Sequence, residues 1–570
     1  MPGSDAILGV WDGHDSGAAL LVGGRLVAAA NEERFTRRKL EIHFPEASIR
    51  FCLAQAGLEP GALRRAAFST ADPSRALTRW LPSLKEENYL LRRRKVPPGW
   101  AAPLKRRFKF WVNELRPCGL SRALSRLYAV RRLRALGLRD FELSFVDHHL
   151  CHAHAAAAAS GSGSCVVVTL DGIGDGDCGG VWVREGGKLR ELARFDGRTS
   201  LGIFFETLTH LLNMREVEDE GKVMALADYA LPVPDSENPM LGFFKVSGLS
   251  LTSPWTRSAM QAELGRIVWR HPPDQAAFMA QRLVEKLVPE LFRNAMKVSG
   301  LKDLAYAGGL AANVKVNRLL RERLGARSLS VFPHMGDGGL AAGAAWACAS
   351  ELGQDGAGLP DVFLGPGFTD GQISVACRAF PGLRLEPVAD PARCAAALVA
   401  EGKIVLWFQG RMEYGPRALG GRSILARPDS TALKDELNLK LKRRAWYQPF
   451  CPSVLESEAD ALFEEYRGAA DRFMTVAYMV RPERRRSLAG VISVDGTCRP
   501  QIAAEDGSLY GRFLQELKAL TGLGACLNTS FNIHGEPMVC SPEDAFRAFS
   551  RMPVDDMLIG GWRACKSRPV

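Results

Sequence analysis

The residues with the clearest capacity for chemistry are four histidines within seven positions, in the segment DHHLCHAHAAAA at 147–158. The alanine-rich composition predicts a helix, so His148 and His152, four residues apart, lie on one face. Two imidazoles in that arrangement suit a single metal ion. Asp171, at the end of an apolar run, and Asp337, in HMGDGG, are candidate oxygen ligands. The pattern predicts a His2Asp2 metal site with room for substrate or water.

The ligand types leave the metal open, because nitrogen and carboxylate ligands with free positions suit iron, zinc or manganese. Iron is our first expectation. The alternative interpretation is a helix with ordinary histidines, which the gathering of four of the chain's 10 histidines disfavours. His149 and His154 point to other faces of the predicted helix, where we expect them to pack or to support the ligands.

His14 is the candidate general base, because it lies between Asp12 and Asp15 in the loop DGHDSG. A neighbouring carboxylate can orient an imidazole and keep it basic, as proton removal requires. We therefore assign catalytic roles to His14 and Asp12. A loop histidine taken alone is more often an ordinary surface residue.

Cationic side chains stand beside glycines in the last third of the chain, a pattern typical of anion capture by guanidinium groups and backbone N–H groups. In the loop GRMEYGPRALGGRS at 410–423, glycines and a proline fix the arginines, so a solvated charge run fits poorly. The polar run at 528–532 is expected to line the same pocket. The candidate cations are Arg411, Arg417, Arg422, Lys440, Lys442, Arg443, Arg444 and Arg499.

The elements expected to position these residues repeat along the chain, at an interval of about 160 residues. Each copy consists of three apolar runs that predict a strand meander, at 6–11, 18–22 and 25–30 and again at 165–170, 180–183 and 188–192. A polar Asp-Gly loop follows the first run of each copy. This duplication predicts an α/β fold of the actin and hexokinase ATPase type, in which paired loops face a nucleotide cleft.

A stretch rich in glycine, proline and aspartate at 351–371 precedes a second alternating α/β segment. We place the domains at 1–360 and 361–570. Residues 91–140 predict a basic helical insertion, with 15 Lys and Arg against 2 acidic residues and several aromatic residues. Contact with nucleic acid or an anionic membrane is one interpretation of this segment, and a solvated helical insertion is the other.

Composition excludes several classes of protein. The 570 residues are 46% hydrophobic, which indicates two or more globular domains. Without a long apolar run or a secretory signal, we expect a cytoplasmic protein with no membrane span. The 13 cysteines include no CxxC spacing, which disfavours disulfide frameworks and thiolate zinc sites. Neither a Walker loop, a Rossmann fingerprint nor a nucleophile elbow is present.

With these motifs in hand, the whole chain resembles the O-carbamoyltransferases of antibiotic and nodulation-factor biosynthesis, a family that includes the tobramycin, novobiocin and cephalosporin carbamoyltransferases. The resemblance runs from end to end. It is carried by DGHDSGAALLVGGRLVAAANEERFTRRK, DHHLCHA, TLDGIGD, SLGIFFETLT, EGKVMALA, GGLAANVKVN, GDGGLAAGAA, EYGPRALGGRSILARP, VDGTCR and LNTSFNIHGEPMVCSPEDA.

The resemblance implies a first domain like the tRNA threonylcarbamoyl-transfer enzymes and a second like the YrdC family. It implies that the second domain joins carbamoyl phosphate to ATP, with Mg2+, to give carbamoyl-adenylate and pyrophosphate. The first domain then transfers the carbamoyl group to a hydroxyl of a small-molecule acceptor, a secondary metabolite. The sequence does not define the acceptor or the oligomeric state.

Matched motif by motif, the resemblance implies that His148, His152, Asp171 and Asp337 are metal ligands and that His14 is the base for the acceptor hydroxyl. The residues expected at the nucleotide are Gly308, Gly309, Asn313 and Lys222. Those expected at carbamoyl phosphate and the adenylate are Arg417, Arg422, Lys442, Arg499, Asn528 and Ser530. The chain departs from the family pattern at Ala445, Gln448 and Ser493, where the family has Glu, Arg and His, and these positions bear on adenylate formation.

Three other functions stay open. A tRNA-modifying threonylcarbamoyl-type transferase would explain the basic segment at 91–140, although we expect no nucleic-acid partner. A sugar kinase of the actin-like superfamily would transfer the γ-phosphoryl group of ATP and yield ADP. A non-catalytic nucleotide sensor is favoured only by the three departures from the family pattern.

Overall fold

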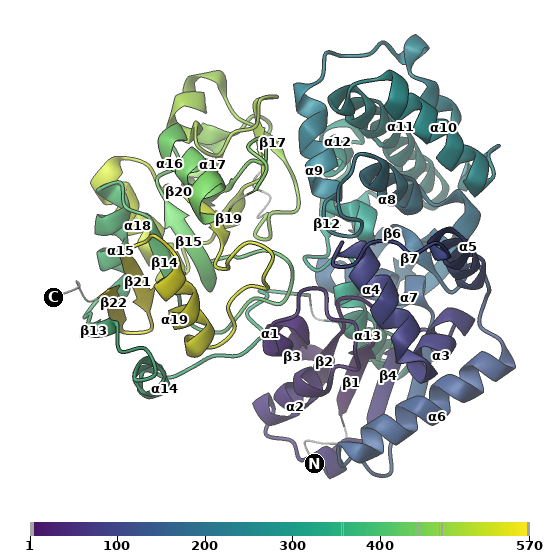
Figure 1. Cartoon of the computed structure of the whole chain (residues 1–570), viewed down its shortest axis with the longest axis horizontal. Coiled ribbons are helices and arrows are strands. Elements are labelled where there is room, and N and C mark those ends of the chain that lie inside the picture. Colours follow the sequence, from purple (N-terminus) through teal and green to yellow (C-terminus); the bar gives the residue numbers. More distant parts are fainter. Residues whose placement is uncertain are drawn as a thin grey trace. The chain divides into compact units, whose positions relative to one another are not determined.

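The computed structural model describes residues 5–354, 356, 358–442, 444–466, 468 and 471–566, so Arg443, one of the candidate cations, lies outside the described residues. The chain divides into two compact units (Figure 1). Unit 1 comprises residues 1–32 and 40–360, and unit 2 comprises residues 33–39 and 361–570.

Unit 1 contains two five-stranded sheets with the same topology, in the strand orders β3-β2-β1-β4-β5 and β8-β7-β6-β11-β12. In each sheet three strands form an antiparallel meander, and two more strands run parallel to the first strand of that meander. The repetition confirms the predicted duplication and the fold of the actin and hexokinase type. The strands are β1 (Ala6–Trp11), β2 (Gly17–Val22), β3 (Arg25–Asn31), β4 (Arg65–Ser69), β5 (Glu142–Val146), β6 (Ser164–Gly174), β7 (Asp177–Glu185), β8 (Lys188–Asp196), β11 (Asp303–Ala307) and β12 (Ser328–Val331).

Two helices rich in alanine pack between the two sheets. Helix α13 (Leu340–Glu351) packs on the first sheet, α7 (His148–Ser160) packs on the second, and the two helices pack on each other. A Cβ atom at Gly343 would lie 2.1 Å from the Cys151 carbonyl oxygen, and one at Gly9 would lie 1.8 Å from that of Ala341. Only glycine permits this close approach.

The remaining helices of unit 1 pack on the sheets or on one another and include an insertion between β4 and β5. They are α2 (Glu46–Gln55), α3 (Pro73–Trp80), α4 (Pro82–Arg92), α5 (Ala102–Asn113), α6 (Gly119–Ala135), α8 (Leu201–Leu211), α9 (Glu220–Leu226), α10 (Arg257–Arg270), α11 (Pro273–Ser299) and α12 (Val314–Arg323). A two-stranded ribbon, β9 (Lys245–Ser247) and β10 (Ser250–Thr252), completes the unit. In the part of the chain that is described, no helix is long and apolar enough to cross a membrane.

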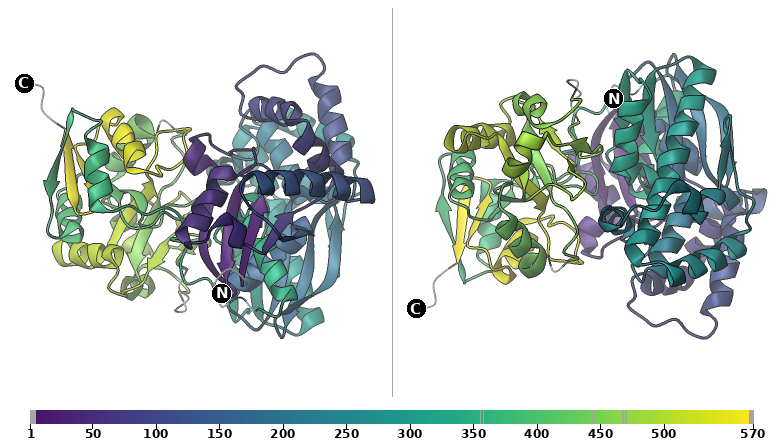
Figure 2. Two further views of the ribbon diagram at one scale, coloured as in Figure 1. Left: turned by 90° about the horizontal axis from the view of Figure 1, so that it is seen from below. Right: turned by 90° about the horizontal axis from the view of Figure 1, so that it is seen from above.

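Unit 2 is a mixed α/β domain around an eight-stranded sheet of order β13-β22-β21-β14-β15-β20-β16-β19 (Figure 2). These strands are β13 (Leu383–Pro387), β14 (Val405–Phe408), β15 (Arg422–Ala426), β16 (Cys451–Leu455), β19 (Gln501–Ala503), β20 (Ala525–Ser530), β21 (Asp556–Ile559) and β22 (Trp562–Lys566), with a separate pair β17 (Tyr478–Met479) and β18 (Thr497–Cys498). The helices are α14 (Asp370–Cys377), α15 (Pro391–Ala400), α16 (Thr431–Glu436), α17 (Glu456–Leu462), α18 (Leu509–Thr521) and α19 (Pro542–Arg551).

A short segment from the N-terminal part of the sequence belongs to unit 2. It contains α1 (Glu33–Thr36), and Arg37 donates hydrogen bonds to the carbonyl oxygens of Met538, at 2.6 Å, and Pro537, at 2.8 Å. A domain boundary near residue 360 does not account for this segment, which the chain inserts into unit 2 between β3 and α2.

Candidate active site

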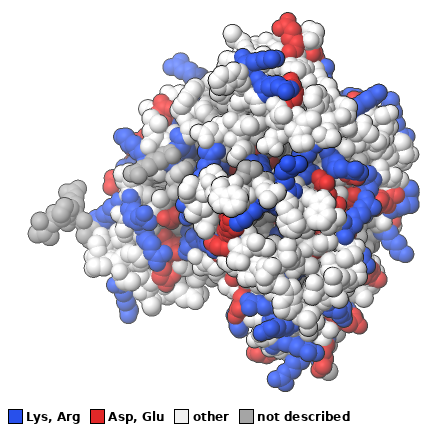
Figure 3. Space-filling model, turned by 45° about the vertical axis from the view of Figure 1, so that its right-hand side comes forward, with Lys and Arg blue, Asp and Glu red and all other residues white. Residues whose placement is uncertain are grey.

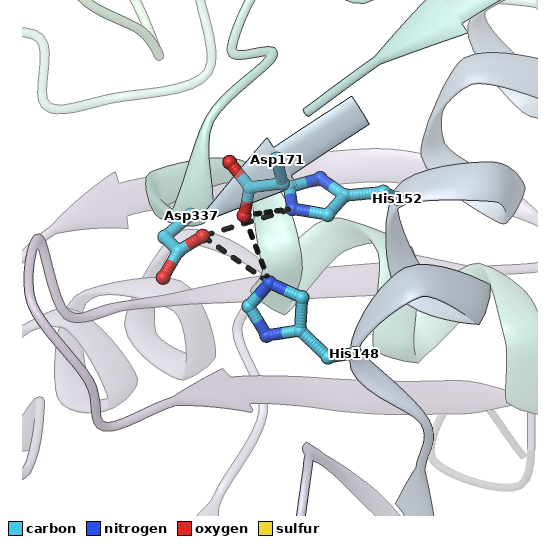
Figure 4. Close-up of side chains that lie close together, drawn as sticks. All are labelled: His148, His152, Asp171 and Asp337. Carbon is cyan, nitrogen blue, oxygen red and sulfur yellow. Dashed lines mark hydrogen bonds and ion pairs between the residues drawn. The ribbon is translucent and has the colours of Figure 1, made fainter. Parts of the chain in front are cut away.

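The four predicted metal ligands lie together in unit 1 (Figure 4). His148 and His152 project from one face of α7, Asp171 lies on β6, and Asp337 begins the short turn before α13. The His148 Nε2 atom is 3.1 Å from Asp171 Oδ2 and 3.4 Å from Asp337 Oδ1. The corresponding distances from His152 Nε2 are 3.4 and 3.7 Å. One candidate donor atom from each residue therefore points to a common centre.

This arrangement fits a metal ion. Ligand bonds of about 2.0–2.2 Å in tetrahedral or octahedral geometry separate neighbouring donor atoms by roughly 3.0–3.5 Å, which is close to the distances observed between these side chains. The buried His152 Nε2 atom has no hydrogen-bond partner among the described residues. The backbone N–H of Gly309 donates to Asp171 Oδ1 at 2.7 Å, so Oδ2 is left to face the histidines.

The charges of the cluster also favour a cation. Burial alone would raise the pKa of Asp171, but the hydrogen bond with His148 and the nearby His152 imidazole hold it well below its usual value. The pKa of Asp337 is likewise lowered, against the effect of burial, by His14 and His148. Both carboxylates are therefore ionised at neutral pH.

His149, on another face of α7, supports the ligands. Its Nε2 atom lies 2.9 Å from the Asp177 carbonyl oxygen, and its ring contacts that of His148 with centroids 5.0 Å apart. His154 is half-buried and lies outside the four-residue cluster.

His14 lies next to this cluster, with its Nδ1 atom 3.4 Å from Asp337 Oδ2 and about a third of its side chain exposed, at 34%. Burial lowers the pKa of the imidazole to about 4, against the opposing charge of Asp337. The ring is therefore neutral at pH 7 and able to accept a proton.

Asp12 pairs with Arg79 rather than with His14, and its assigned catalytic role stays a prediction. Both carboxylate oxygens of Asp12 accept hydrogen bonds from the buried Arg79, at 2.8 and 2.9 Å. Asp337 is the carboxylate beside His14 instead. Although burial would raise it, the pair with Arg79 lowers the pKa of Asp12 to about 2.

The helices of the insertion hold the loop that carries His14. Arg79 lies on α3, Lys85 on α4 donates to the Asp12 carbonyl oxygen, and the guanidinium of Arg75 stacks 4.6 Å from the centroid of the Trp11 ring. The sequence reasoning missed these residues because they lie more than 60 positions from the loop, in no recognisable motif.

The predicted nucleotide residues lie in unit 1, where the side chains of Asn313 and Lys222 contact other residues of the fold. Gly308 has a φ of +95°, and a Cβ atom there would lie 2.2 Å from the Leu170 carbonyl oxygen. Asn313 caps α12 and exchanges hydrogen bonds with Gln281, at 2.7 and 3.2 Å. Lys222 pairs with Asp219 at 2.8 Å. Their contact with a nucleotide stays a prediction.

Three arginines of unit 2 gather around the thiol of Cys451. Arg499 donates to its Sγ atom from Nε and Nη2, at 3.2 and 3.0 Å. Burial, Arg499 and Arg444 lower the pKa of Arg417 to about 9, and burial lowers that of Arg444 to about 10. Among the described residues, Arg417 has no hydrogen-bond or ion-pair partner. A cluster of this kind is suited to bind an anion.

Lys442 and the polar run of β20 lie in the same unit. The Lys442 Nζ atom donates to Asn532 Oδ1 at 2.8 Å and to the Ser530 carbonyl oxygen. Burial, with Arg444 and Lys39 nearby, holds the pKa of Lys442 well below its usual value. The Nδ2 atom of Asn528 donates to the Ala418 carbonyl oxygen at 3.1 Å, whereas its buried Oδ1 atom has no hydrogen-bond partner among the described residues.

The side chain of Arg422 donates to backbone carbonyl oxygens, and its role in phosphate binding stays a prediction. The side chain is fully buried, its guanidinium donates to the carbonyl oxygens of Gln409, Gly421 and Pro366 at 2.9–3.1 Å, and it stacks 3.6 Å from the centroid of the Phe408 ring. Arg422 therefore ties the glycine-rich loop to the sheet. The spacing of arginines in the sequence did not distinguish it from Arg417.

The fold and the sites define the class: an α/β protein with a duplicated ATPase-type unit, a His2Asp2 cluster beside a neutral imidazole, and a second unit with a cationic cluster. Residues 6–346 match the model of the carbamoyltransferase N-terminus, and residues 396–566 match that of the carbamoyltransferase C-terminus. The chain belongs to the carbamoyltransferase family and is a transferase, which confirms the resemblance predicted from the sequence.

Relatives support this membership along the whole chain. Nodulation protein NolNO of Sinorhizobium fredii is 32% identical over 566 residues, which cover 96% of this chain and 78% of that protein. Protein MJ1058 of Methanocaldococcus jannaschii is 34% identical over 467 residues, which cover 77% of this chain and 76% of that protein.

Among solved structures, full-length HypF in its phosphate- and nucleotide-bound form is similar with a TM-score of 0.37 and 11% identity, over 63% of this chain and 57% of that one.

Proposed function

We propose that this chain is an ATP-dependent O-carbamoyltransferase that forms carbamoyl-adenylate in unit 2 and transfers the carbamoyl group to a hydroxyl in unit 1. Family membership supports carbamoyl transfer. The observation that carries the proposal is the neutral His14 imidazole beside Asp337 of the His2Asp2 cluster. A base next to a cation site suits the attack of a hydroxyl on an activated carbonyl.

In unit 2, Arg417, Arg444 and Arg499 lie close together, and no carboxylate among the described residues forms an ion pair with them. They would bind the anionic groups of carbamoyl phosphate and of ATP, which enters with Mg2+. Water releases inorganic phosphate from carbamoyl phosphate. The resulting carbamate oxygen attacks the α-phosphorus of ATP, so pyrophosphate leaves and carbamoyl-adenylate forms. The cations stabilise the charge that develops on the leaving groups.

In unit 1, His14 removes the proton of the acceptor hydroxyl through Nε2, because Nδ1 faces Asp337. The acceptor oxygen bonds to the carbamoyl carbon, the bond from that carbon to the phosphate oxygen breaks, and AMP leaves. Asp337 stabilises the imidazolium that forms. A metal ion held by His148, His152, Asp171 and Asp337, iron by expectation with zinc or manganese as alternatives, would supply Lewis acidity when bound.

The acceptor we propose is a small secondary metabolite with a free hydroxyl. The chain departs from the family pattern near the unit 2 cluster, where the buried Oε1 atom of Gln448 has no hydrogen-bond partner among the described residues. Arg444 is retained and stacks 4.0 Å from the centroid of the Phe450 ring. Arg417, Arg444 and Arg499 would therefore still supply positive charge for adenylate formation despite the departures at Ala445 and Gln448.

Two variants test whether adenylate formation and carbamoyl transfer take place at separate sites in the two units. His14→Gln should keep carbamoyl phosphate-dependent release of pyrophosphate and lose transfer to an alcohol, by about 100-fold or more. Arg417→Ala should lose pyrophosphate release as well. Equal loss of both activities in both variants, in proteins that remain folded, would contradict the assignment of the two steps to separate sites.

A further inference from the structure

Helix α5 presents an apolar stripe to solvent. Leu104, Phe108 and Trp111, at helical spacing, are 70%, 53% and 58% exposed, and Trp100, just before the helix, is 96% exposed. The ring centroids of Phe108 and Trp111 lie 5.9 Å apart. Single exposed apolar side chains are ordinary, whereas several along one helical face mark an interaction surface. These four residues are called the α5 stripe.

The opposite face of α5 is fixed to unit 1. Arg106 pairs with Glu216 at 3.0 Å, and Arg92, at the end of α4, pairs with Glu216 at 3.4 Å. The guanidinium of Arg257, on α10, lies 4.5 Å from the centroid of the Phe110 ring. Because polar and ionic contacts hold the inner face, the stripe faces outward on a positioned helix.

The surroundings of the stripe are basic. Lys105 and Arg107 are exposed on α5 beside it, and Lys95 is exposed in the segment before the helix. Residues 91–140, which also include α6, hold 15 Lys and Arg against 2 acidic residues. The side of the molecule that carries α5 comes forward in Figure 3, where blue basic side chains border uncharged surface. Lys105 also pairs with the exposed Glu87 at 2.7 Å, an interaction that water weakens.

A helix with Trp, Phe and Leu on one face and Lys and Arg beside them is typical of segments that lie in the surface of an anionic membrane. Tryptophan favours the headgroup region, and basic side chains can extend along apolar surface to reach lipid phosphates. We propose that the α5 stripe docks this protein on a membrane surface that contains anionic lipids.

Nucleic acid is the other polyanion to which this segment could bind, and the contacts favour lipid over it. Phosphate backbones are bound chiefly by Lys and Arg, but Arg92, Arg93 and Arg106 are occupied by Glu206, Glu218 and Glu216. Besides Lys105 and Arg107, the described residues of the helix expose two aromatic side chains and one aliphatic side chain. An aliphatic side chain such as Leu104 offers nothing to a phosphate and inserts readily among acyl chains.

Docking would have a consequence for the reaction. The α3 and α4 helices that precede α5 hold the His14 loop through Arg79 and Lys85, and α3 also packs on α5. The candidate base and the stripe are therefore linked through these helices. The docked protein would then bind a hydroxyl acceptor with an apolar tail at the lipid surface. This consequence rests on the proposed function, whereas docking itself does not.

The test is flotation of the full-length protein with vesicles of phosphatidylcholine alone or mixed with phosphatidylserine. The proteins are the wild type, Trp100→Ala/Trp111→Ala, Lys105→Glu/Arg107→Glu, and the control Trp269→Ala, which removes a tryptophan that is 91% exposed on α10. Binding of labelled single-stranded RNA is measured in parallel. Thermal unfolding checks that each variant is folded.

We expect the wild type and Trp269→Ala to bind the mixed vesicles, and each double variant to bind about tenfold less or weaker still. Added salt should weaken binding, because the basic side chains contribute to it. The proposal is overturned if the wild type does not bind the mixed vesicles, if Trp269→Ala loses as much as the double variants, or if RNA binds and vesicles do not. Because the readout is binding, a failure of the proposed reaction would not affect it.

Discussion

Replacement of Arg79 by methionine is the perturbation whose effect follows most directly from the structure. Both partners of the Asp12–Arg79 pair are buried, each with a side chain 2% exposed, so the variant leaves the Asp12 carboxylate in the interior without its counter-ion. The pair lowers the pKa of Asp12 from 3.8 to about 2. At about 1.4 kcal/mol for each pKa unit, this corresponds to about 2.5 kcal/mol. Removing one partner of a buried pair is expected to cost about 3 kcal/mol.

The pH dependence follows from the sign of the shift. Because the pKa of Asp12 is lower in the folded protein than in the unfolded chain, the stabilisation is complete above about pH 4. It disappears as the pH falls through about 2, where Asp12 is protonated even in the folded state. The difference between Arg79→Met and the wild type should therefore shrink in acid.

Native-state hydrogen exchange of β1 and β2 is the assay, since it reports on unit 1 without requiring the two units to unfold together. A loss of about 3 kcal/mol lowers protection by about 100-fold. The matched control is Arg50→Met, because Arg50 pairs with Glu46 at 3.0 Å on an exposed helix face and should contribute less than about 1 kcal/mol. Equal loss of protection in the two variants at pH 7 would refute the reasoning.

Three further changes have expected outcomes. Asp171→Asn should lower the metal content of the purified protein, measured by elemental analysis, by about tenfold or more, and an unchanged metal content would be inconsistent with the His2Asp2 site. Arg422→Met should destabilise unit 2 by about 3 kcal/mol in denaturant unfolding, because Arg422 holds buried carbonyl groups. Arg417→Met should leave the free energy of unfolding within about 1 kcal/mol of the wild type and raise the KM for carbamoyl phosphate. The reverse pattern would show that the two arginines have each other's roles. Gly343→Val should disrupt the packing of α13 on α7 by about 4 kcal/mol or more, seen as loss of soluble protein or a much lower midpoint of thermal unfolding, and a variant as stable as the wild type would show that this contact is loose.

The sequence predicted those features whose signals are local. The two meanders repeat with apolar runs and Gly-Gly turns, so the duplication was visible before the sheets were known. His148 and His152 share a helix face by spacing alone. The association of these histidines with Asp337, 189 positions after His148, was suggested by the residue types and by the family motif rather than by spacing.

Other features depend on contacts that no local pattern records. The partner of Asp12 is Arg79, 67 residues away on an insertion helix. The closeness of His14 to Asp12 in the sequence therefore did not predict this contact. Arg417 and Arg422 occupy similar positions in a glycine-rich loop. Arg417 has no hydrogen-bond or ion-pair partner among the described residues, whereas Arg422 donates hydrogen bonds to backbone carbonyl oxygens. The inclusion of residues 33–39 in unit 2 likewise depends on long-range hydrogen bonds of Arg37.

The measurement that tests the central claim most directly is the product pattern of the purified protein with ATP, Mg2+ and carbamoyl phosphate, with and without a panel of alcohols. The proposed function predicts pyrophosphate that depends on carbamoyl phosphate, together with AMP and a carbamate ester when an acceptor is present. Release of ADP without pyrophosphate would contradict it and would indicate a kinase of the same fold.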